Sequence, residues 1–230
     1  MQRENAPENE NIAAEDLGFS RVIYQDKRLY RFTSDSVLLS RFASVKPGEV
    51  VADLCSGSGI VGFHLYGLNA EKIKSVTFFE MQKPLYDLSV ASIKKNALED
   101  RFFAVNTRVQ DIDKSYYGKF SLCVCNPPYM AVDSGAHDKS ETVAICKREI
   151  ALNVTELAKS LAAVLKYGGR ACLVHRADRL TDVICALRAA GLEPKRLQFV
   201  LAAKPEPYLF MIEAVKGGKS GLKVLGNIKN

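Results

Sequence analysis

Seven short apolar runs recur along the chain, each five to eight residues long. Runs of this length, bounded by turn residues, predict buried strands. They occupy residues 50–54, 75–79, 102–106, 120–125, 171–175, 196–203 and 208–215. Polar residues with carboxylate or amide side chains follow several of these runs directly, so the predicted strands end in groups that can bind a ligand.

Longer segments with apolar residues at helical spacing separate most of these runs. They predict helices over residues 34–42, 84–97, 145–167 and 179–190, and a short helix from residue 60. Gly168-Gly169 is expected to end the long helix. No helix separates the last two predicted strands, so these two are expected to pair antiparallel. The alternation predicts an α/β fold with one doubly wound, mostly parallel sheet.

The N-terminal region does not follow this alternation. Residues 1–16 contain many Glu and Asn residues and few apolar ones, which predicts a disordered acidic tail before a single domain over residues 17–230. Two β-like runs, residues 21–24 and 28–32, lie on either side of a polar turn and predict a small hairpin.

Composition excludes several classes of protein. Hydrophobic residues make up 47% of the chain, which is sufficient for a core. No run of eighteen apolar residues occurs and the N-terminus is polar, so neither a membrane span nor a signal peptide is expected. The six cysteines lack Cys-x-x-Cys spacing, which predicts reduced, buried thiols in a cytoplasmic protein. Cys123 and Cys125 are expected to point into one core face, so no metal is expected. We expect a monomer.

One stretch combines rigidity with polar groups: Asn126-Pro127-Pro128-Tyr129, directly after the run at 120–125. Each proline fixes φ and removes a backbone donor, and Asn126 is pushed out of the helical region. The Asn126 side-chain oxygen and the Pro127 carbonyl are two fixed acceptors for the hydrogens of an amine on a planar ring, and Tyr129 can stack on that ring. The alternative is an ordinary turn. Residues 130–142 predict a mobile loop over the site.

Other strand ends suggest a nucleoside cofactor. Asp53 and the turn glycines Gly57 and Gly59 follow the first strand, where the glycines allow close approach of a ligand and the acid suits an ammonium group. Glu80 is placed to accept ribose hydroxyls, and Asp111 an adenine amino group. A ligand with all three groups, beside an amine-binding elbow, indicates S-adenosylmethionine. A nicotinamide dehydrogenase is the weaker hypothesis, because the third glycine of the dinucleotide pattern is missing.

These motifs resemble those of class I amino-methyltransferases, and more narrowly the bacterial tRNA(Val) adenine-N6-methyltransferase family. The resemblance also includes residues 31–39 and 174–180. The His175-Arg176 stretch and the segment 216–223 are what narrow it to this family. It implies a Rossmann-like, seven-stranded sheet with an antiparallel last strand, and N6-methylation of the adenosine 3′ of the anticodon in a valine tRNA. It assigns Asn126, Pro127 and Tyr129 to the target base. It assigns to the cofactor Thr33, Asp35, Asp53, Cys55, Gly57, Gly59, Glu80, Asp111 and Asn126.

Charge suggests where RNA would bind. The net charge is +6, although residues 1–16 hold five acids and one arginine, and residues 216–230 hold four lysines and no acid. This asymmetry predicts a polyanionic partner, with ordinary solubility charge as the alternative. The candidate RNA contacts are Arg28, Arg31, Arg176, Arg179, Lys216, Lys219 and Lys223.

Two other functions are compatible with the motifs. The first is N-methylation of an rRNA guanine or of a protein glutamine. The glutamine enzymes usually carry a helical N-terminal domain, which this sequence does not predict. The second is a non-catalytic RNA-binding module, against which the intact Asp53, Glu80 and Asn126 argue.

Overall fold

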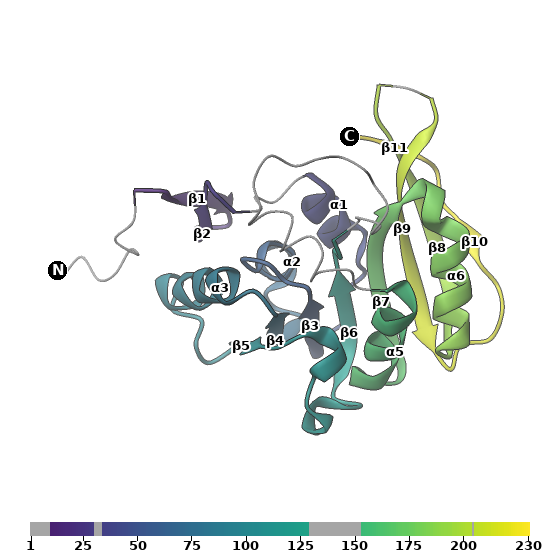
Figure 1. Ribbon diagram of the computed structural model, residues 1–230, viewed down its shortest axis with the longest axis horizontal. Coiled ribbons are helices and arrows are strands. Elements are labelled where there is room, and N and C mark those ends of the chain that lie inside the picture. The colour runs from purple at the N-terminus through teal and green to yellow at the C-terminus, as the bar shows by residue number, and fades with distance from the viewer. Residues whose placement is uncertain (1–9, 30–33, 129–152, 204) are drawn as a thin grey trace.

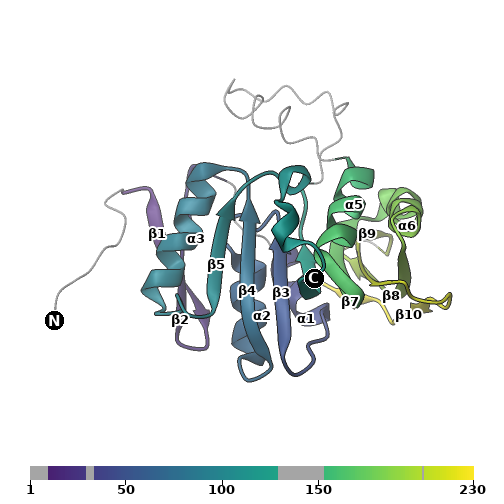
Figure 2. The same cartoon turned by 90° about the horizontal axis from the view of Figure 1, so that it is seen from below.

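A single twisted sheet forms the centre of the protein (Figures 1 and 2). The computed structural model describes residues 10–29, 34–128, 153–203 and 205–230. The strand order is β10-β8-β9-β7-β6-β3-β4-β5, and β11 also pairs with β8. The strands are β3 (Glu49–Leu54), β4 (Ile73–Glu80), β5 (Phe102–Asn106), β6 (Phe120–Cys125), β7 (Leu165–Arg176), β8 (Leu192–Leu201), β9 (Pro207–Lys216), β10 (Lys223–Val224) and β11 (Ile228–Lys229).

Strand direction follows the prediction. The strands β5, β4, β3, β6 and β7 are parallel, whereas β9 is antiparallel to both β7 and β8. The seven long strands therefore form a mostly parallel sheet whose last long strand is antiparallel. The carboxyl ends of β3, β4 and β6 lie at one edge of this sheet, where ligands bind in open α/β sheets.

Helices cover both faces of the sheet. The helices are α1 (Ser34–Phe42), α2 (Ile60–Asn69), α3 (Lys83–Lys95), α5 (Val154–Val164) and α6 (Leu180–Ala189). Residues of α1, α2 and α3 share one buried cluster with alternate sheet residues such as Val51 and Val124. Residues of α5 and α6 share the second cluster with Ala52 and Cys123. In the described part of the chain, no helix is long and apolar enough to cross a membrane.

The N-terminal hairpin differs from the prediction. Strand β1 (Ile12–Gly18) pairs with β2 (Arg21–Asp26), so the hairpin turns at Phe19 and Ser20. Residues 28 and 29, the described part of the predicted second run, form a turn and not a strand, and residues 30–32 lie outside the described residues. Phe19 and Ser20 both have positive φ, 57° and 56°, as a tight right-twisting hairpin requires. Residues 12–16 therefore belong to a strand and not to a tail.

Packing against α3 stabilises this hairpin. Ile12 and Tyr24 pack against Leu85 and Leu88 of α3. The Oγ of Ser92 accepts a hydrogen bond from the backbone N–H of Tyr24 at 2.9 Å. Both views in Figures 1 and 2 show β1 and β2 beside α3. The sequence analysis missed β1 because its partners lie about seventy residues away in the chain.

The predicted helix over 145–167 is also wrong at its C-terminal end. Helix α5 ends at Val164, and Leu165 already pairs with Phe120 as the first residue of β7. The two glycines lie within β7, where the register with β6 shifts between Phe120 and Leu122. A Cβ at Gly169 would lie 2.8 Å from the Lys166 carbonyl oxygen, so glycine is needed for this irregularity. Residues 145–152 lie outside the described residues, as does the predicted loop 130–142.

Two further details depart from the predictions. Residues 223–229 contribute β10 and β11 beside β8, so this segment forms an edge of the sheet, although most of its side chains are exposed. Cys123 and Cys125 are both buried in one cluster, as predicted. Cys185, by contrast, is exposed on α6, and Cys146 lies outside the described residues.

Buried ion pairs attach the end of α1 to the sheet. Arg170 contacts Glu49 and, at 3.8 Å, Glu213, and all three side chains are buried. Arg196 donates to Glu213 at 3.1 Å and to the Phe42 carbonyl at 3.3 Å. Arg170 also donates to the carbonyl of Ser44, just after α1. These bonds fix α1, whose first turn reaches the carboxyl edge of the sheet.

Candidate active site

The stretch Asn126-Pro127-Pro128-Tyr129, which we call the elbow, directly follows the central strand β6 at the carboxyl edge of the sheet. Every residue of β6 is buried, and its last residue, Cys125, pairs with Leu54 of β3 and Leu173 of β7. Asn126 is half-buried and Pro127 is buried, whereas Pro128 is exposed. Tyr129 lies outside the described residues. The pairing of β6 with β3 brings Asn126 next to the turn that follows Asp53, as the sequence predicted.

A serine of α1 holds the Asn126 side chain. The Nδ2 of Asn126 donates to the Oγ of Ser36 at 2.9 Å, and Ser36 is only 2% exposed. Because the amide nitrogen makes this bond, the bond fixes the rotation of the Asn126 amide group. The nitrogen faces Ser36, and the oxygen Oδ1 faces away from it. The sequence analysis missed Ser36, because the two residues lie 90 positions apart.

The turn after β3 has the backbone geometry that its glycines allow. Gly57 and Gly59 have positive φ, 57° and 92°, and so does Cys55, at 58°. A Cβ at Gly59 would lie 2.8 Å from the Phe78 ring, whereas one at Gly57 would meet no atom within 4 Å. Gly59 is therefore required for packing, and Gly57 leaves open space for a ligand.

Glu80 ties this turn to the end of β4. Its Oε2 accepts from the Gly57 N–H at 2.8 Å, and its Oε1 accepts from the Gln82 N–H at 2.8 Å. Burial raises the pKa of the Glu80 carboxyl, although these two backbone bonds oppose the shift. Each carboxylate oxygen has a second lone pair, so Glu80 can still accept hydroxyl hydrogens.

Asp53 lies deeper than a direct ligand contact would need. It is 0% exposed, and its Oδ2 accepts from the Gly62 N–H of α2 at 2.9 Å. Burial raises the pKa of Asp53 to about 8. Its Oδ1 and the Ser56 Oγ are buried without a hydrogen-bond partner in the described part of the chain. Of these two atoms, only the Ser56 Oγ lies in the turn itself, where an unsatisfied polar atom fits a site for a ligand with polar groups.

Gln25 is a further residue that the sequence analysis did not identify. It lies in β2, is 2% exposed, and donates from Nε2 to the Oγ of Ser58 at 2.7 Å. The hairpin therefore supports the glycine-containing turn directly. A polar residue inside an apolar strand was the only local indication of this contact.

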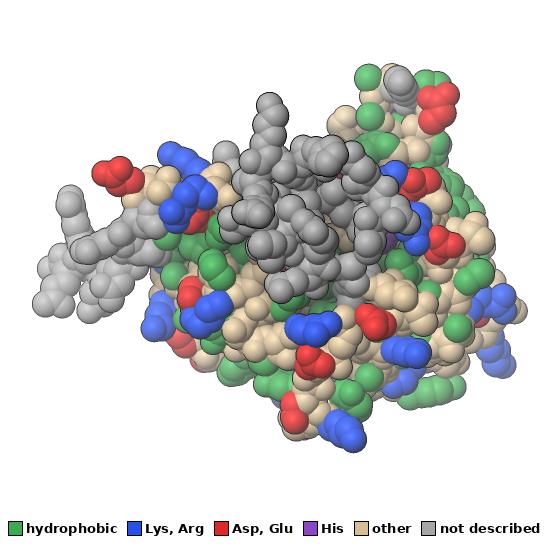
Figure 3. All heavy atoms as spheres, viewed as in Figure 1, with side chains coloured by type: hydrophobic (Ala, Val, Ile, Leu, Met, Phe, Trp, Pro, Cys, Tyr) green, Lys and Arg blue, Asp and Glu red, His purple; other side chains and the backbone are tan. Residues whose placement is uncertain are grey.

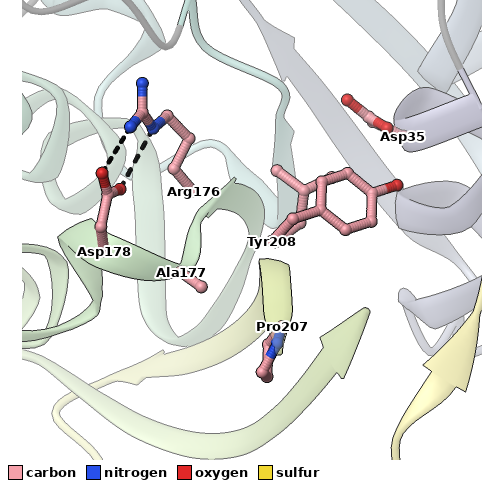
Figure 4. Close-up of a pocket in the computed structure, with 7 residues that line it drawn as sticks. Asp35, Arg176, Ala177, Asp178, Pro207 and Tyr208 are labelled. Carbon is pink, nitrogen blue, oxygen red and sulfur yellow. Dashed lines mark hydrogen bonds and ion pairs between the residues drawn. The ribbon is translucent and has the colours of Figure 1, made fainter. Parts of the chain in front are cut away.

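The other predicted cofactor residues are not part of the turn after β3. Asp111 ends the short helix η1 (Val109–Asp111) after β5 and is exposed. Asp35, in the first turn of α1, lines a separate cavity together with Arg176 and Tyr208 (Figure 4). Thr33 lies outside the described residues.

The predicted RNA contacts divide into two groups. Three arginines each pair with a nearby acid: Arg28 with Asp26, Arg176 with Asp178, and Arg179 with Asp182. Their side chains are between 37% and 58% exposed. Figure 3 accordingly shows Lys and Arg side chains interspersed with Asp and Glu on the visible face. Arg31 lies outside the described residues.

The three lysines lie elsewhere. Lys216 donates from Nζ to the carbonyls of Ala162 and Leu165, at 2.6 and 2.7 Å, and so caps the end of α5. It lies at the sheet edge opposite the elbow, because β9 runs antiparallel to β7. Lys219 and Lys223 are exposed, and Lys223 pairs with Arg196 in the first half of β8. The structure therefore does not bring these lysines to the site.

Comparison with known proteins assigns the family. Residues 32–179, more than half of the chain, match the methyltransferase small domain family. The chain belongs to this family. The match confirms the resemblance to class I methyltransferases that the motifs predicted. A crystal structure of a predicted O-methyltransferase from Agrobacterium tumefaciens is 17% identical, with a TM-score of 0.67, covering 85% of this chain and 86% of that chain. The Rossmann-like methyltransferase fold is therefore confirmed.

The names of curated relatives are more specific than the name of the family. A tRNA1(Val) (adenine(37)-N6)-methyltransferase from a Flavobacteriaceae bacterium (strain 3519-10) is 26% identical over 156 residues, which cover 66% of this chain and 62% of the relative. This match thus spans less than two thirds of that relative's length. A protein of the same name from Haemophilus influenzae (strain PittGG) is 23% identical over 195 residues, which cover 80% of this chain and 82% of the relative.

Proposed function

We propose that this protein is a cytoplasmic, S-adenosylmethionine-dependent methyltransferase that modifies N6 of an adenosine in tRNA. The single observation that carries the proposal is the Asn126 amide, held by Ser36 at 2.9 Å at the end of a buried central strand. The names of the relatives support tRNA, and more narrowly the adenosine 3′ of the anticodon in a valine tRNA, as the substrate.

The turn after β3 and the end of β4 are the proposed cofactor site. Cys55, Gly57 and Gly59 form the backbone against which the methionyl part lies. Glu80 accepts the ribose hydroxyls, and Asp111 the adenine amino group. Asp53 acts mainly by holding α2 through the Gly62 N–H at 2.9 Å. When bound, S-adenosylmethionine supplies a methyl group that its sulfonium has already activated.

The elbow is the proposed site of the target amine. The Asn126 Oδ1 and the Pro127 carbonyl accept the two amine hydrogens, which turns the nitrogen lone pair out of the ring plane. Tyr129 stacks on the base. No strong base is required, because the amine releases its proton only after it has become cationic. Alignment by these residues is therefore the main catalytic contribution of the chain.

Methyl transfer from labelled S-adenosylmethionine to unmodified total tRNA tests this function. Nucleoside digestion and mass analysis should show N6-methyladenosine, and sequencing of the product should place it next to the anticodon. Transfer to rRNA or to a protein glutamine would retain the chemistry and reject the substrate. Absence of cofactor binding in calorimetry would reject the enzyme.

A further inference from the structure

A cavity of about 480 Å³ lies beside the elbow, at the carboxyl end of β7. We call it the β7 cavity. Its walls come from the end of β7, the start of β9 and the first turn of α1 (Figure 4). The lining residues used below are Asp35, Arg176, Ala177, Asp178, Pro207 and Tyr208. Its volume lies within the range of pockets that bind small organic ligands, roughly 300–1,000 Å³.

The β7 cavity shares a wall with the proposed active site. Asp35 directly precedes Ser36, the residue that holds the Asn126 amide. Cys125, the residue before Asn126, pairs with Leu173, three residues before Arg176 of the cavity. The first turn of α1 therefore contributes both to the support of Asn126 and to the wall of this cavity.

The walls provide an aromatic face. Tyr208 is 36% exposed, and its hydroxyl accepts from the Nδ2 of Asn230 at 2.6 Å. The same Nδ2 donates to the Oγ of Ser34, at the start of α1. These bonds hold the ring by its polar end. Figure 4 shows the ring next to Asp35, with Pro207 below it and with Arg176 and Ala177 on the opposite side of the cavity.

Two charged groups of the cavity, Arg176 and Asp178, pair with each other. Arg176 donates from two nitrogens to both oxygens of Asp178, at 3.1 and 2.5 Å. The backbone N–H of Arg176 also donates to the Nδ1 of the buried His175 at 2.9 Å. This bidentate bond with Arg176 lowers the pKa of Asp178, so this carboxylate is ionised and only accepts. A carboxylate has about four acceptor positions, so Asp35 and Asp178 can each receive a further hydrogen.

We propose that the β7 cavity binds an unpaired nucleotide adjacent to the target adenosine in the RNA. Its base stacks on Tyr208, and an exocyclic amino group of that base donates to the carboxylate of Asp35. Arg176 lies at the rim, where it faces the phosphate or the base plane. Stacking on aromatic rings with hydrogen bonds at base edges is how proteins recognise single-stranded RNA. The inference rests on the proposed function, because it assumes an RNA substrate.

The test compares RNA binding by three tyrosine variants, measured by fluorescence anisotropy with an unmodified tRNA anticodon stem-loop. Tyr208→Ala should raise the Kd for the RNA about tenfold, the effect of losing one stacked base. Tyr208→Phe retains the ring and should recover most of this loss. Tyr167→Ala is the matched control, because Tyr167 is 80% exposed and lies near the start of β7, whereas Tyr208 lies in β9 beside the end of β7. Calorimetric binding of S-adenosylmethionine should be equal in all variants, which shows that each is folded.

A second comparison tests the proposed hydrogen bond between the amino group of the base and Asp35. Stem-loops in which the nucleotide next to the target lacks its amino group should bind the wild-type protein several-fold more weakly. The Asp35→Ala variant, which has no side-chain acceptor, should not distinguish these RNAs from the parent. Equal RNA affinity of Tyr208→Ala and wild type, or a loss that Tyr208→Phe does not recover, would overturn the inference. Methyl transfer by the wild type is a separate readout: its absence rejects the proposed function even if the cavity binds RNA.

Discussion

Ser36 and Asn126 lie 90 residues apart, and the Nδ2 of Asn126 donates to the Oγ of Ser36 at 2.9 Å. One residue belongs to the first turn of α1 and the other follows the central strand β6. Since α1 is attached to the sheet through Arg170 and Arg196, the serine has a fixed position. The amide that would hold the target amine is therefore oriented by a helix, and not by the elbow alone.

Removal of the Ser36 hydroxyl should slow methyl transfer without weakening cofactor binding. In Ser36→Ala the Asn126 amide loses the bond that sets its rotation, and we expect kcat to fall about tenfold, corresponding to one lost hydrogen bond. Ser36→Thr keeps a hydroxyl and should recover most of the rate. Steady-state kinetics and calorimetry measure the two quantities. A loss of cofactor affinity equal to the loss of rate would show that Ser36 only supports folding.

Asn126→Ala should lower turnover by about a hundredfold or more, as removal of one preorganised polar group at a reacting centre does. Cofactor affinity should remain close to that of the wild type. In the Asn126→Ala background, Ser36→Ala should have no further effect on turnover, since its partner is gone. Normal turnover in Asn126→Ala would mean that the elbow has only a structural role.

The two turn glycines should respond differently to substitution. Gly59→Ala forces positive φ on alanine and brings Cβ to 2.8 Å from Phe78, so the free energy of unfolding should fall by about 2 kcal/mol. Gly57→Ala adds Cβ in open space and should cost about 1 kcal/mol. Cofactor affinity should nevertheless fall more in the folded Gly57→Ala protein, because its methyl group occupies the space proposed for the ligand. Urea unfolding and calorimetry test both statements.

The raised pKa of Asp53 predicts how stability depends on pH. Burial raises the pKa of this carboxyl to about 8, above its ordinary value of 3.8, so the folded state binds its proton more tightly than the unfolded state. This contribution to stability is complete below pH 3.8 and is lost as pH rises to about 8. Asn cannot titrate. The free energy of unfolding of Asp53→Asn, relative to wild type, should therefore rise by about 1 kcal/mol per pH unit between pH 5 and pH 7. A difference that does not change with pH would contradict this reasoning.

Substitution of Lys216 should change the stability of the protein, whereas substitution of Arg176 should change its affinity for tRNA. Lys216→Met removes two bonds to the end of α5 and should lower the free energy of unfolding by about 1–2 kcal/mol, with no change in affinity for tRNA. Arg176→Ala should weaken tRNA binding and reduce its salt dependence by about one phosphate contact. Urea unfolding and binding titrations at several salt concentrations make the comparison. The reverse result would place the RNA at the opposite edge of the sheet.

Local sequence pattern was sufficient for the framework of the protein. The ranges of β5 and β6 agree with the predicted strands, and the start of α2 after Gly59 also agrees. These elements are specified by contiguous apolar residues and by turn residues next to them. The placement of Glu80, Gly57 and Asn126 at one edge follows from the parallel order of the strands, which the alternation of helices and strands already implies.

Long-range contacts decided the rest. Strand β1 depends on its packing against α3, and Leu165 joins β7 because it pairs with Phe120. Lys216 has the sequence context of a basic tail, yet it caps a helix more than fifty residues earlier. The bond between Ser36 and Asn126 and the cavity around Tyr208 have the same origin. Each joins segments that are distant in the chain, and only the packed sheet and helices bring them within hydrogen-bonding or contact distance.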